Sequence, residues 1–231
     1  MNPAEAFEVQ RAAFDKDGTM FCPPAIRTRP PSPGKFLTQA VIKDWFGKFL
    51  NPNEAVAQLV TLRSRLACSN KPKVVEQAVK ELAAVLGAKG SRPEQEFGEG
   101  PDDLWIWPQL NLVIECKNEV EESLSKTDAG QLSLSMAWFT KNYQQLSAPI
   151  PVVIAAVQIA KAKSGFGENV RVVTPEKMKV LLDNLDKFVA ALVAELPLLL
   201  TEERIHKLQG DFQILPEQFI ANYTVALKEV K

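Results

Sequence analysis

The sequence predicts an α/β fold in which helices flank a mixed central sheet. The 231-residue chain is long enough for one sizeable domain with an appendage, and 46% apolar and 24% charged residues are ordinary for a globular protein. Residues 151–157 form a continuous apolar, β-branched run, which is typical of a strand buried on both faces. The predicted elements follow the order helix, strands, helix, strand, strand, helix, which indicates a sheet with mixed pairing between helical layers.

Residues 1–69 are predicted to form an N-terminal arm, a Pro-rich linker and a helical appendage. The arm, residues 1–20, has weak helical periodicity, and the five prolines between Cys22 and Gly34 indicate an extended linker. Residues 36–66 predict two helices, because apolar side chains recur at helical spacing on both sides of a break near Asn51-Pro52. We therefore place the boundary of the main domain at residue 70.

Residues 70–231 are predicted to form the main domain, and each element in it is identified by the period of its apolar side chains. The first helix starts near Ser69 or Asn70, has Pro72 in its first turn, and stops at Gly87 or Gly90. The remaining elements are strands at 101–107 and 111–117, a helix at 125–144, strands at 151–157 and 170–173, a helix from Thr174-Pro175 to about residue 193, and helices at 201–208 and 215–229.

Charge and cysteine content exclude several classes of protein. A net charge of −1 excludes a globally basic nucleic-acid binder, so any nucleic-acid surface must be a local patch. The three cysteines are far apart and odd in number, which argues against a disulfide framework and a zinc site. The N-terminus lacks an apolar signal region, and Phe188–Leu200 is too short to span a bilayer. We expect a cytoplasmic protein that does not contact membranes.

The most informative segment is the run from Asn111 to Glu119. Strand alternation places Val113, Glu115 and Lys117 on one face, and Leu112, Ile114 and Cys116 on the other. A carboxylate and an ammonium group therefore stand side by side at the end of an apolar strand. The turn at Gly100-Pro101 delivers another carboxylate, Asp102, into the adjoining strand. This arrangement suits a phosphodiesterase that holds Mg²⁺ between carboxylates.

Each residue of this pattern has a predicted role. Asp102 and Glu115 are expected to bind the metal together with the backbone carbonyl of Cys116, and Lys117 orients the attacking water or offsets negative charge. A Glu-x-Lys pair is also common as a solvated surface pair, but the apolar strand, the preceding turn and the flanking helices favour a site. Asp103 competes with Asp102, and alternation allows only one of them to share a face with Glu115.

Several motifs together resemble the PD-(D/E)XK nuclease superfamily, which has the restriction-endonuclease-like fold. The resemblance is closest to the nuclease-like C-terminal region of some bacterial DEAD/DEAH-box helicases, and it covers about residues 70–231. The matching segments are Gly100–Trp105, Val113–Asn118, Lys126–Gln131, Trp138-Phe139, Pro151–Ile154, Val173–Lys177, Pro216–Phe219 and Tyr223-Thr224. The resemblance implies an αβββαβ core, dependence on Mg²⁺ (or Mn²⁺), DNA rather than RNA as substrate, and a helicase as partner.

The resemblance also implies the site residues. Asp102 and Glu115 match the metal ligands, and Lys117 matches the catalytic lysine. Many members add a glutamate on the first core helix, for which Glu76 is the first choice and Glu81 the alternative; either also fits a solvated helix position.

Two further positions lie on the next helix. Gln131 matches a polar position that often faces the active site, but its spacing from Asp128 also fits a capping box. Some relatives have a tyrosine one turn later, where this chain has Ser135, so the match to that subgroup is in doubt.

The sequence therefore predicts a Mg²⁺-dependent deoxyribonuclease that acts alone or with a helicase, and it leaves room for a homodimer. The alternative is an inactive nuclease-fold module that binds nucleic acid or a protein partner. A third hypothesis is a structural protein in which Glu115 and Lys117 form a surface ion pair. Trp105 and Trp107 favour packing over base stacking, and His206 favours a structural role.

Overall fold

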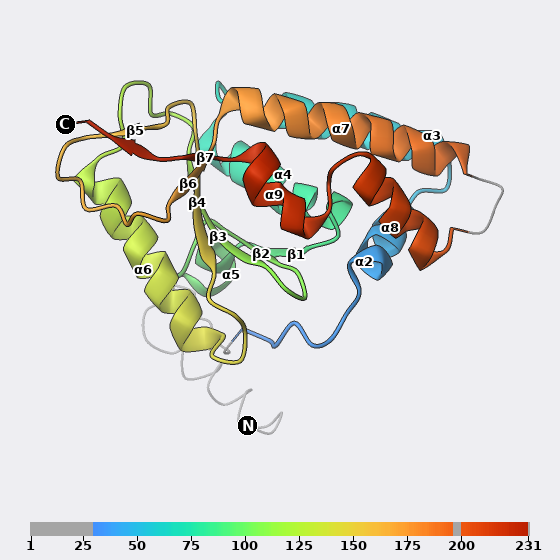
Figure 1. Ribbon diagram of the computed structural model, residues 1–231, viewed down its shortest axis with the longest axis horizontal. Coiled ribbons are helices and arrows are strands. Elements are labelled where there is room, and N and C mark those ends of the chain that lie inside the picture. The colour runs from blue at the N-terminus through green and yellow to red at the C-terminus, as the bar shows by residue number, and fades with distance from the viewer. Residues whose placement is uncertain (1–29, 196–199, 231) are drawn as a thin grey trace, which may run out of the picture. The chain divides into compact units, whose positions relative to one another are not determined.

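The centre of the fold is a mixed six-stranded sheet with the strand order β1-β2-β3-β4-β6-β7 (Figure 1). The protein is described by a computed structural model over residues 30–195 and 200–230, of which Ser32 onward forms one compact unit. The strands of the sheet are β1 (Lys89–Ser91), β2 (Asp103–Ile106), β3 (Asn111–Lys117), β4 (Ile150–Ala155), β6 (Arg171–Val173) and β7 (Val225–Ala226). A separate parallel pair joins β5 (Ile159–Ala160) to β8 (Lys228–Glu229).

The pairing in the sheet is parallel at its centre and antiparallel towards its edges. β3, β4 and β6 run parallel, whereas β2 is antiparallel to both β1 and β3, and β7 is antiparallel to β6. The parallel strands are mostly apolar and buried, as expected when helices cover both faces of a sheet. The predicted α/β class with a mixed sheet is confirmed.

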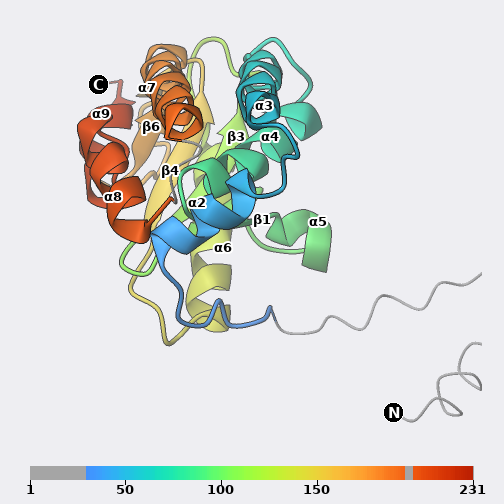
Figure 2. The ribbon, with the colours of Figure 1, turned by 90° about the vertical axis from the view of Figure 1, so that its right-hand side faces the viewer.

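Helices cover both faces of the sheet, as Figures 1 and 2 show. They are α2 (Thr38–Phe46), α3 (Pro52–Arg65), α4 (Pro72–Val85), α5 (Pro93–Phe97), α6 (Lys126–Asn142), α7 (Pro175–Ala194), α8 (Glu202–Asp211) and α9 (Pro216–Tyr223). One hydrophobic cluster packs Leu112, Ile114 and Cys116 of β3 against the layer that contains α4 and α7. The other packs Val113 against α6. The alternation predicted for β3 is confirmed.

Helices α2 and α3 belong to the same hydrophobic cluster as α4, α7 and α8. Figure 2 shows α3 and α7 running side by side above the sheet. The predicted division at residue 70 stays a prediction, and the structure adds that the segment before it shares this core. The predictions for residues 1–20 and for most of the Pro-rich run lie outside the described residues. None of the helices within the described ranges is long and apolar enough to cross a membrane.

Several short elements differ from the sequence prediction, and the two-residue strand β5 is one of them. Helix α4 ends at Val85, and Gly87 follows with φ +79°. Of the two predicted stops, Gly87 therefore ends the helix, and Gly90 lies in β1. The period of the apolar side chains did not predict this strand. Helix α5 was also missed. The helix predicted at 215–229 is wrong beyond Tyr223, because Thr224 is extended and Val225 pairs with Val172 of β6. Sheet pairing there overrides the local helical pattern.

Candidate active site

Strands β2 and β3 bring Asp102 and Glu115 to the same face of the sheet. Asp103 pairs with Ile114, so the preceding residue, Asp102, lies beside Glu115. The carboxylate of Asp102 accepts a 2.8 Å hydrogen bond from the backbone N–H of Cys116. Asp103 points to the other face, where its carboxylate is buried 3.9 Å from the thiol sulfur of Cys116. The aspartate that shares a face with Glu115 is therefore Asp102.

A glycine turn holds Asp102 in this position. Gly100 has φ +105°, and a Cβ on it would lie 2.8 Å from both the Trp138 ring and Pro93. Trp138 in turn stacks on Phe97 at the end of α5. A side chain at position 100 would therefore push the turn away from α6, and Asp102 would move with it.

Glu115 is a buried carboxylate with a partner on each oxygen. Ser135 Oγ on α6 donates a 2.7 Å hydrogen bond to Oε1, and Lys117 Nζ donates one of 3.2 Å to Oε2. Burial, followed by the charge of Asp102, raises the pKa of Glu115 to about 7, against the opposing effect of Ser135 and Lys117. The carboxyl group therefore gains or loses its proton near neutral pH. A carboxyl group with such a pKa could release its proton to bind a cation at that pH.

Lys117 is held as a cation by its neighbours. Burial, the largest single influence, acts to lower its pKa, but the charges of Glu115 and Asp102 outweigh burial, and the pKa of Lys117 is raised. The side chain is 15% exposed, so the charge lies close to the two carboxylates in a partly desolvated place. Of the two predicted roles, a protonated lysine suits the offsetting of negative charge.

Of the two glutamates predicted for the site from helix α4, Glu76 is the one that lies near Asp102. It forms an ion pair with Arg92, and both side chains are largely buried. The pKa of Glu76 is raised by burial and then by the charge of Asp102, which places Glu76 near the site. Glu81 is directed elsewhere, because its carboxylate pairs with Arg65 of α3 at 2.7 Å. The structure therefore brings Glu76, and not Glu81, to the carboxyl cluster.

Glu94 on α5 is a site residue that the sequence analysis missed. Hydrogen bonding with Asp102 is the first cause of its raised pKa, followed by burial and the charges of Asp102 and Glu76. The signal that could have found it is the Pro-Glu start of α5, because proline favours the first turn of a helix. The carboxyl cluster comprises Glu76, Glu94, Asp102 and Glu115.

The contact from α6 to the site comes from Ser135 and not from Gln131. Gln131 is exposed, one turn before Ser135 on the same helix. The predicted capping alternative for Gln131 is wrong, because the capping box joins Ser125 to Asp128: Asp128 accepts from the Ser125 N–H at 2.7 Å. The helix start predicted at residue 125 is confirmed, whereas the capping alternative would have put it three residues later, at Asp128.

Two further predictions concern residues outside the cluster. Trp105 and Trp107 are buried, and their ring N–H groups donate to the carbonyls of Val79 and Leu86 at 3.1 Å each, so both tryptophans serve packing, as predicted. His206 hydrogen-bonds to Gln39 on the surface, 3.1 Å away. Cys68 and Cys116 are free thiols.

The oxygen donors at the site suit a hard divalent cation, although there are few of them. Asp102 and Glu115 supply carboxylate oxygens, and the carbonyl of Cys116 leaves β3 on the same side as the N–H that reaches Asp102. Within residues 30–195 and 200–230, no group of three or more Asp, Glu, Cys or His side chains is arranged to hold a metal ion. An ion here would have two carboxylates, one carbonyl and waters as ligands, which is a common arrangement for Mg²⁺.

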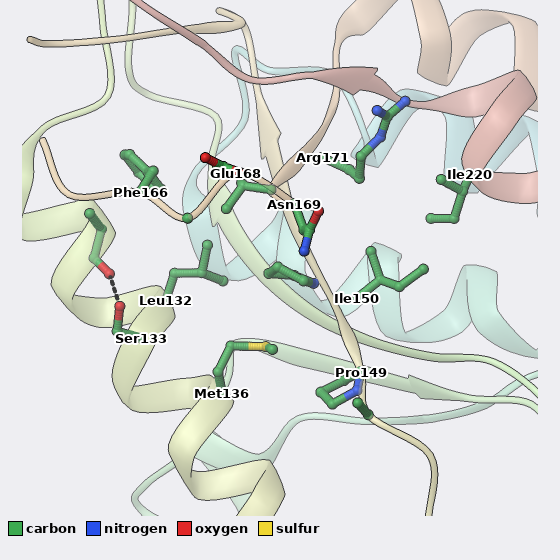
Figure 3. A pocket seen from close by; sticks show the side chains of 15 residues that line it. Leu132, Ser133, Met136, Pro149, Ile150, Phe166, Glu168, Asn169, Arg171 and Ile220 are labelled. Atoms are coloured by element: carbon green, nitrogen blue, oxygen red, sulfur yellow. Dashed lines mark hydrogen bonds between the residues drawn. The ribbon is translucent and has the colours of Figure 1, made fainter.

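A cavity of about 800 Å³ lies at the opposite end of the parallel strands (Figure 3). It is bounded by Leu132 and Met136 of α6, by Ile150 at the start of β4, and by residues 166–171. None of the predicted site residues lines it. A second cavity, of about 280 Å³, is lined by Cys68, Ile154 and Thr174 at the carboxyl ends of the strands. Ligands of open α/β sheets bind at that end, so chemistry is expected near Lys117 rather than in the larger cavity.

A search of protein-family models, curated proteins and solved structures found nothing that matches this chain. The assignment of function therefore depends on the geometry of the carboxyl cluster and Lys117. What the structure establishes is a mixed six-stranded sheet between helical layers, with four carboxyl groups and one lysine gathered at the β2–β3 end.

Proposed function

We propose that the chain is a metal-dependent nuclease of the PD-(D/E)XK type, with a restriction-endonuclease-like core in residues 70–231. The observation that carries this proposal is the meeting of Asp102 with Glu115 and Lys117 on one face of adjacent strands. Further support comes from the element order α4-β1-β2-β3-α6-β4, which matches an αβββαβ core with α5 inserted between the first two strands.

Hydrolysis of a phosphodiester requires an activated water and compensation for the negative charge on the phosphate oxygens. A bound Mg²⁺ or Mn²⁺, held by Asp102, Glu115 and the carbonyl of Cys116, would acidify a water and offset that charge. Lys117 adds a fixed positive charge beside the phosphate oxygens. Ser135 keeps Glu115 oriented through its 2.7 Å hydrogen bond. The water oxygen bonds to phosphorus, the bridging P–O bond breaks, and the leaving oxygen takes up a proton.

DNA is the proposed substrate, in preference to RNA, and a helicase the proposed partner. The net charge of −1 and the carboxyl cluster mean that the phosphate backbone approaches only after a cation has neutralised the site. Two arginines that could contribute to a local basic patch are already paired: Arg63 binds Asp183 at 2.9 Å and Arg65 binds Glu81 at 2.7 Å. Stable DNA capture is therefore expected to need the metal or a partner protein.

The test is cleavage of single-stranded, double-stranded and branched DNA, and of matched RNA, by the full chain with Mg²⁺ or Mn²⁺. Glu115→Gln and Lys117→Ala are expected to abolish cleavage, as is EDTA. Glu81→Gln is the matched control, because Glu81 lies on α4 but pairs with Arg65. Intact substrates in every wild-type reaction would exclude the nuclease assignment.

The second candidate function is an inactive module on the same fold that binds nucleic acid or a protein. It is favoured by the fact that both oxygens of Glu115 and one of Glu76 already have protein partners. DNA binding that weakens with salt but is indifferent to Mn²⁺ and to Lys117→Ala would support this function over hydrolysis.

A further inference from the structure

The carboxyl cluster has a buried arginine at its margin. Arg92, the residue before α5, is 6% exposed, and its guanidinium pairs with Glu76. Nη1 donates to Gln95 at 2.8 Å, and Nε has no hydrogen-bond partner among the described residues. A guanidinium so placed cannot be screened by solvent, so its charge acts on the neighbouring carboxylates at short range.

The carboxyl groups around Asp102 outnumber the basic side chains that pair with them. The negative charge of Asp102 is felt by Glu76, Glu94 and Glu115, and the pKa of each of them is raised. Within residues 30–195 and 200–230, the basic side chains that form ion pairs with members of this cluster are Arg92 and Lys117. When all four carboxyl groups are ionised, two negative charges stay uncompensated, which is the charge of one divalent cation.

We propose that Arg92 is a built-in counter-ion that withdraws Glu76 from metal binding and limits the site to one divalent cation. The inference rests on the proposed function, because it concerns the metal stoichiometry of that site. A second cation held by Glu76 would lie next to a buried guanidinium of like charge. It would also leave Arg92 buried without its carboxylate partner. Arg92 is therefore a positioning residue that defines the ligand set as Asp102, Glu115 and the Cys116 carbonyl.

The test measures Mn²⁺ binding to the full chain without DNA, by titration calorimetry and by electron paramagnetic resonance. The wild type is expected to bind one Mn²⁺. Arg92→Gln adds one net negative charge and is expected to bind a second Mn²⁺ or to bind the first at least about tenfold more tightly. Glu76→Gln is expected to weaken binding by about the same factor.

The double variant Arg92→Gln/Glu76→Gln restores the charge balance and is expected to bind one Mn²⁺ with nearly wild-type affinity. It also removes both charges of the buried pair, so it provides the measurement if Arg92→Gln fails to fold. If Glu76 were a ligand instead, the double variant would bind as weakly as Glu76→Gln. The control is Arg65→Gln, which breaks the Arg65–Glu81 pair on the far side of α4.

The outcomes separate the two proposals. A wild type that binds no Mn²⁺ would overturn the metal-dependent function, and this inference with it. A wild type that binds two Mn²⁺ would overturn the inference alone. So would an Arg92→Gln variant with wild-type stoichiometry and affinity, or a double variant more than about tenfold weaker than wild type.

Discussion

Ser135 Oγ donates a 2.7 Å hydrogen bond to Glu115 Oε1 and thereby joins helix α6 to the end of strand β3. Both residues are buried, so water does not replace this bond. The hydroxyl group stabilises the ionised form of a carboxylate whose pKa burial has raised to about 7. The relationship makes Ser135 the α6 residue with the most direct effect on the proposed metal site.

Ser135→Ala is expected to raise the pKa of Glu115 further, because a hydrogen bond to the charged form is lost. Removing a partner from a buried carboxylate is also expected to destabilise the protein by about 1–3 kcal/mol. Mn²⁺ affinity at neutral pH should fall and recover at higher pH. Ser133→Ala is the control, because Ser133 Oγ donates only to the Ala129 carbonyl, at 2.8 Å. An unchanged pH profile would contradict the role given to Ser135.

Mn²⁺ affinity of the wild type is expected to depend on pH through Glu115. The pKa of Glu115 is raised to about 7, so below that pH the ion must displace a proton. Affinity should rise about tenfold per pH unit below neutrality and level off above it. Calorimetric titrations between about pH 5.5 and 8.5 measure this. Glu115→Gln should remove the dependence together with most of the binding, and a dependence that survives in this variant would point to another group.

Asp103→Asn is expected to stabilise the protein at alkaline pH. Burial raises the pKa of Asp103 well above its usual range, and its Oδ1 has no hydrogen-bond partner among the described residues. Because the folded-state pKa exceeds the unfolded one, stability is fully present below the unfolded pKa and is lost as the pH rises towards the folded pKa. The gain is expected to be on the order of 1 kcal/mol in urea unfolding near pH 8, with little change near pH 4. The exposed Asp44→Asn serves as the control, and equal curves for both variants would contradict the account.

Gly100→Ala is expected to destabilise the protein by about 1–3 kcal/mol and to weaken Mn²⁺ binding, because the new Cβ would meet Trp138 and Pro93 at 2.8 Å in a backbone of φ +105°. Gly130→Ala is the matched control on α6: apart from the adjoining residues and backbone of α6 itself, no described atom lies within 4 Å of the added methyl group. That control should stabilise the helix by about 0.5–1 kcal/mol. Thermal unfolding and Mn²⁺ titration of both variants provide the measurement. A Gly100→Ala variant that binds Mn²⁺ as the wild type does would show that the turn does not position Asp102.

Long elements with a clear period could be predicted from the sequence. β3, with its apolar alternation, and α7, with its Thr174-Pro175 start, were placed within two residues of where the structure has them. The three residues of β1 have no period to detect, and their strand state comes from pairing with β2. The C-terminal segment after Tyr223 has a helical pattern locally, but the open edge of β6 makes it a strand.

Some residues of the candidate site could also be predicted from the sequence, and others could not. Alternation along β2 allowed only one of Asp102 and Asp103 to share a face with Glu115, because neighbouring strand residues face opposite sides. The choice of Asp102 came from the Pro101-Asp102 turn and the resemblance, and the structure places Asp102 on that face. Strand alternation could not identify Glu94 or Arg92 as site residues, because neither lies on a strand of the pattern. Their positions depend on how the segment around α5 packs against α4 and β2. The role of Ser135 was hidden for the same reason: spacing locates it on α6, but only packing shows that it reaches Glu115.

The bond between the Cys116 N–H and Asp102 means that a side chain, and not the backbone, closes the end of the β2–β3 ladder. A ligand that binds the Asp102 carboxylate therefore changes the hydrogen bond of one main-chain amide, that of Cys116. That amide proton, buried beside the site, becomes a local sensor of occupancy: its chemical shift and its exchange with solvent should change when the site fills, while the amides of Leu112 and Ile114 in the same strand stay protected. The proposed metal site and the β2–β3 pairing therefore share one main-chain nitrogen, that of Cys116.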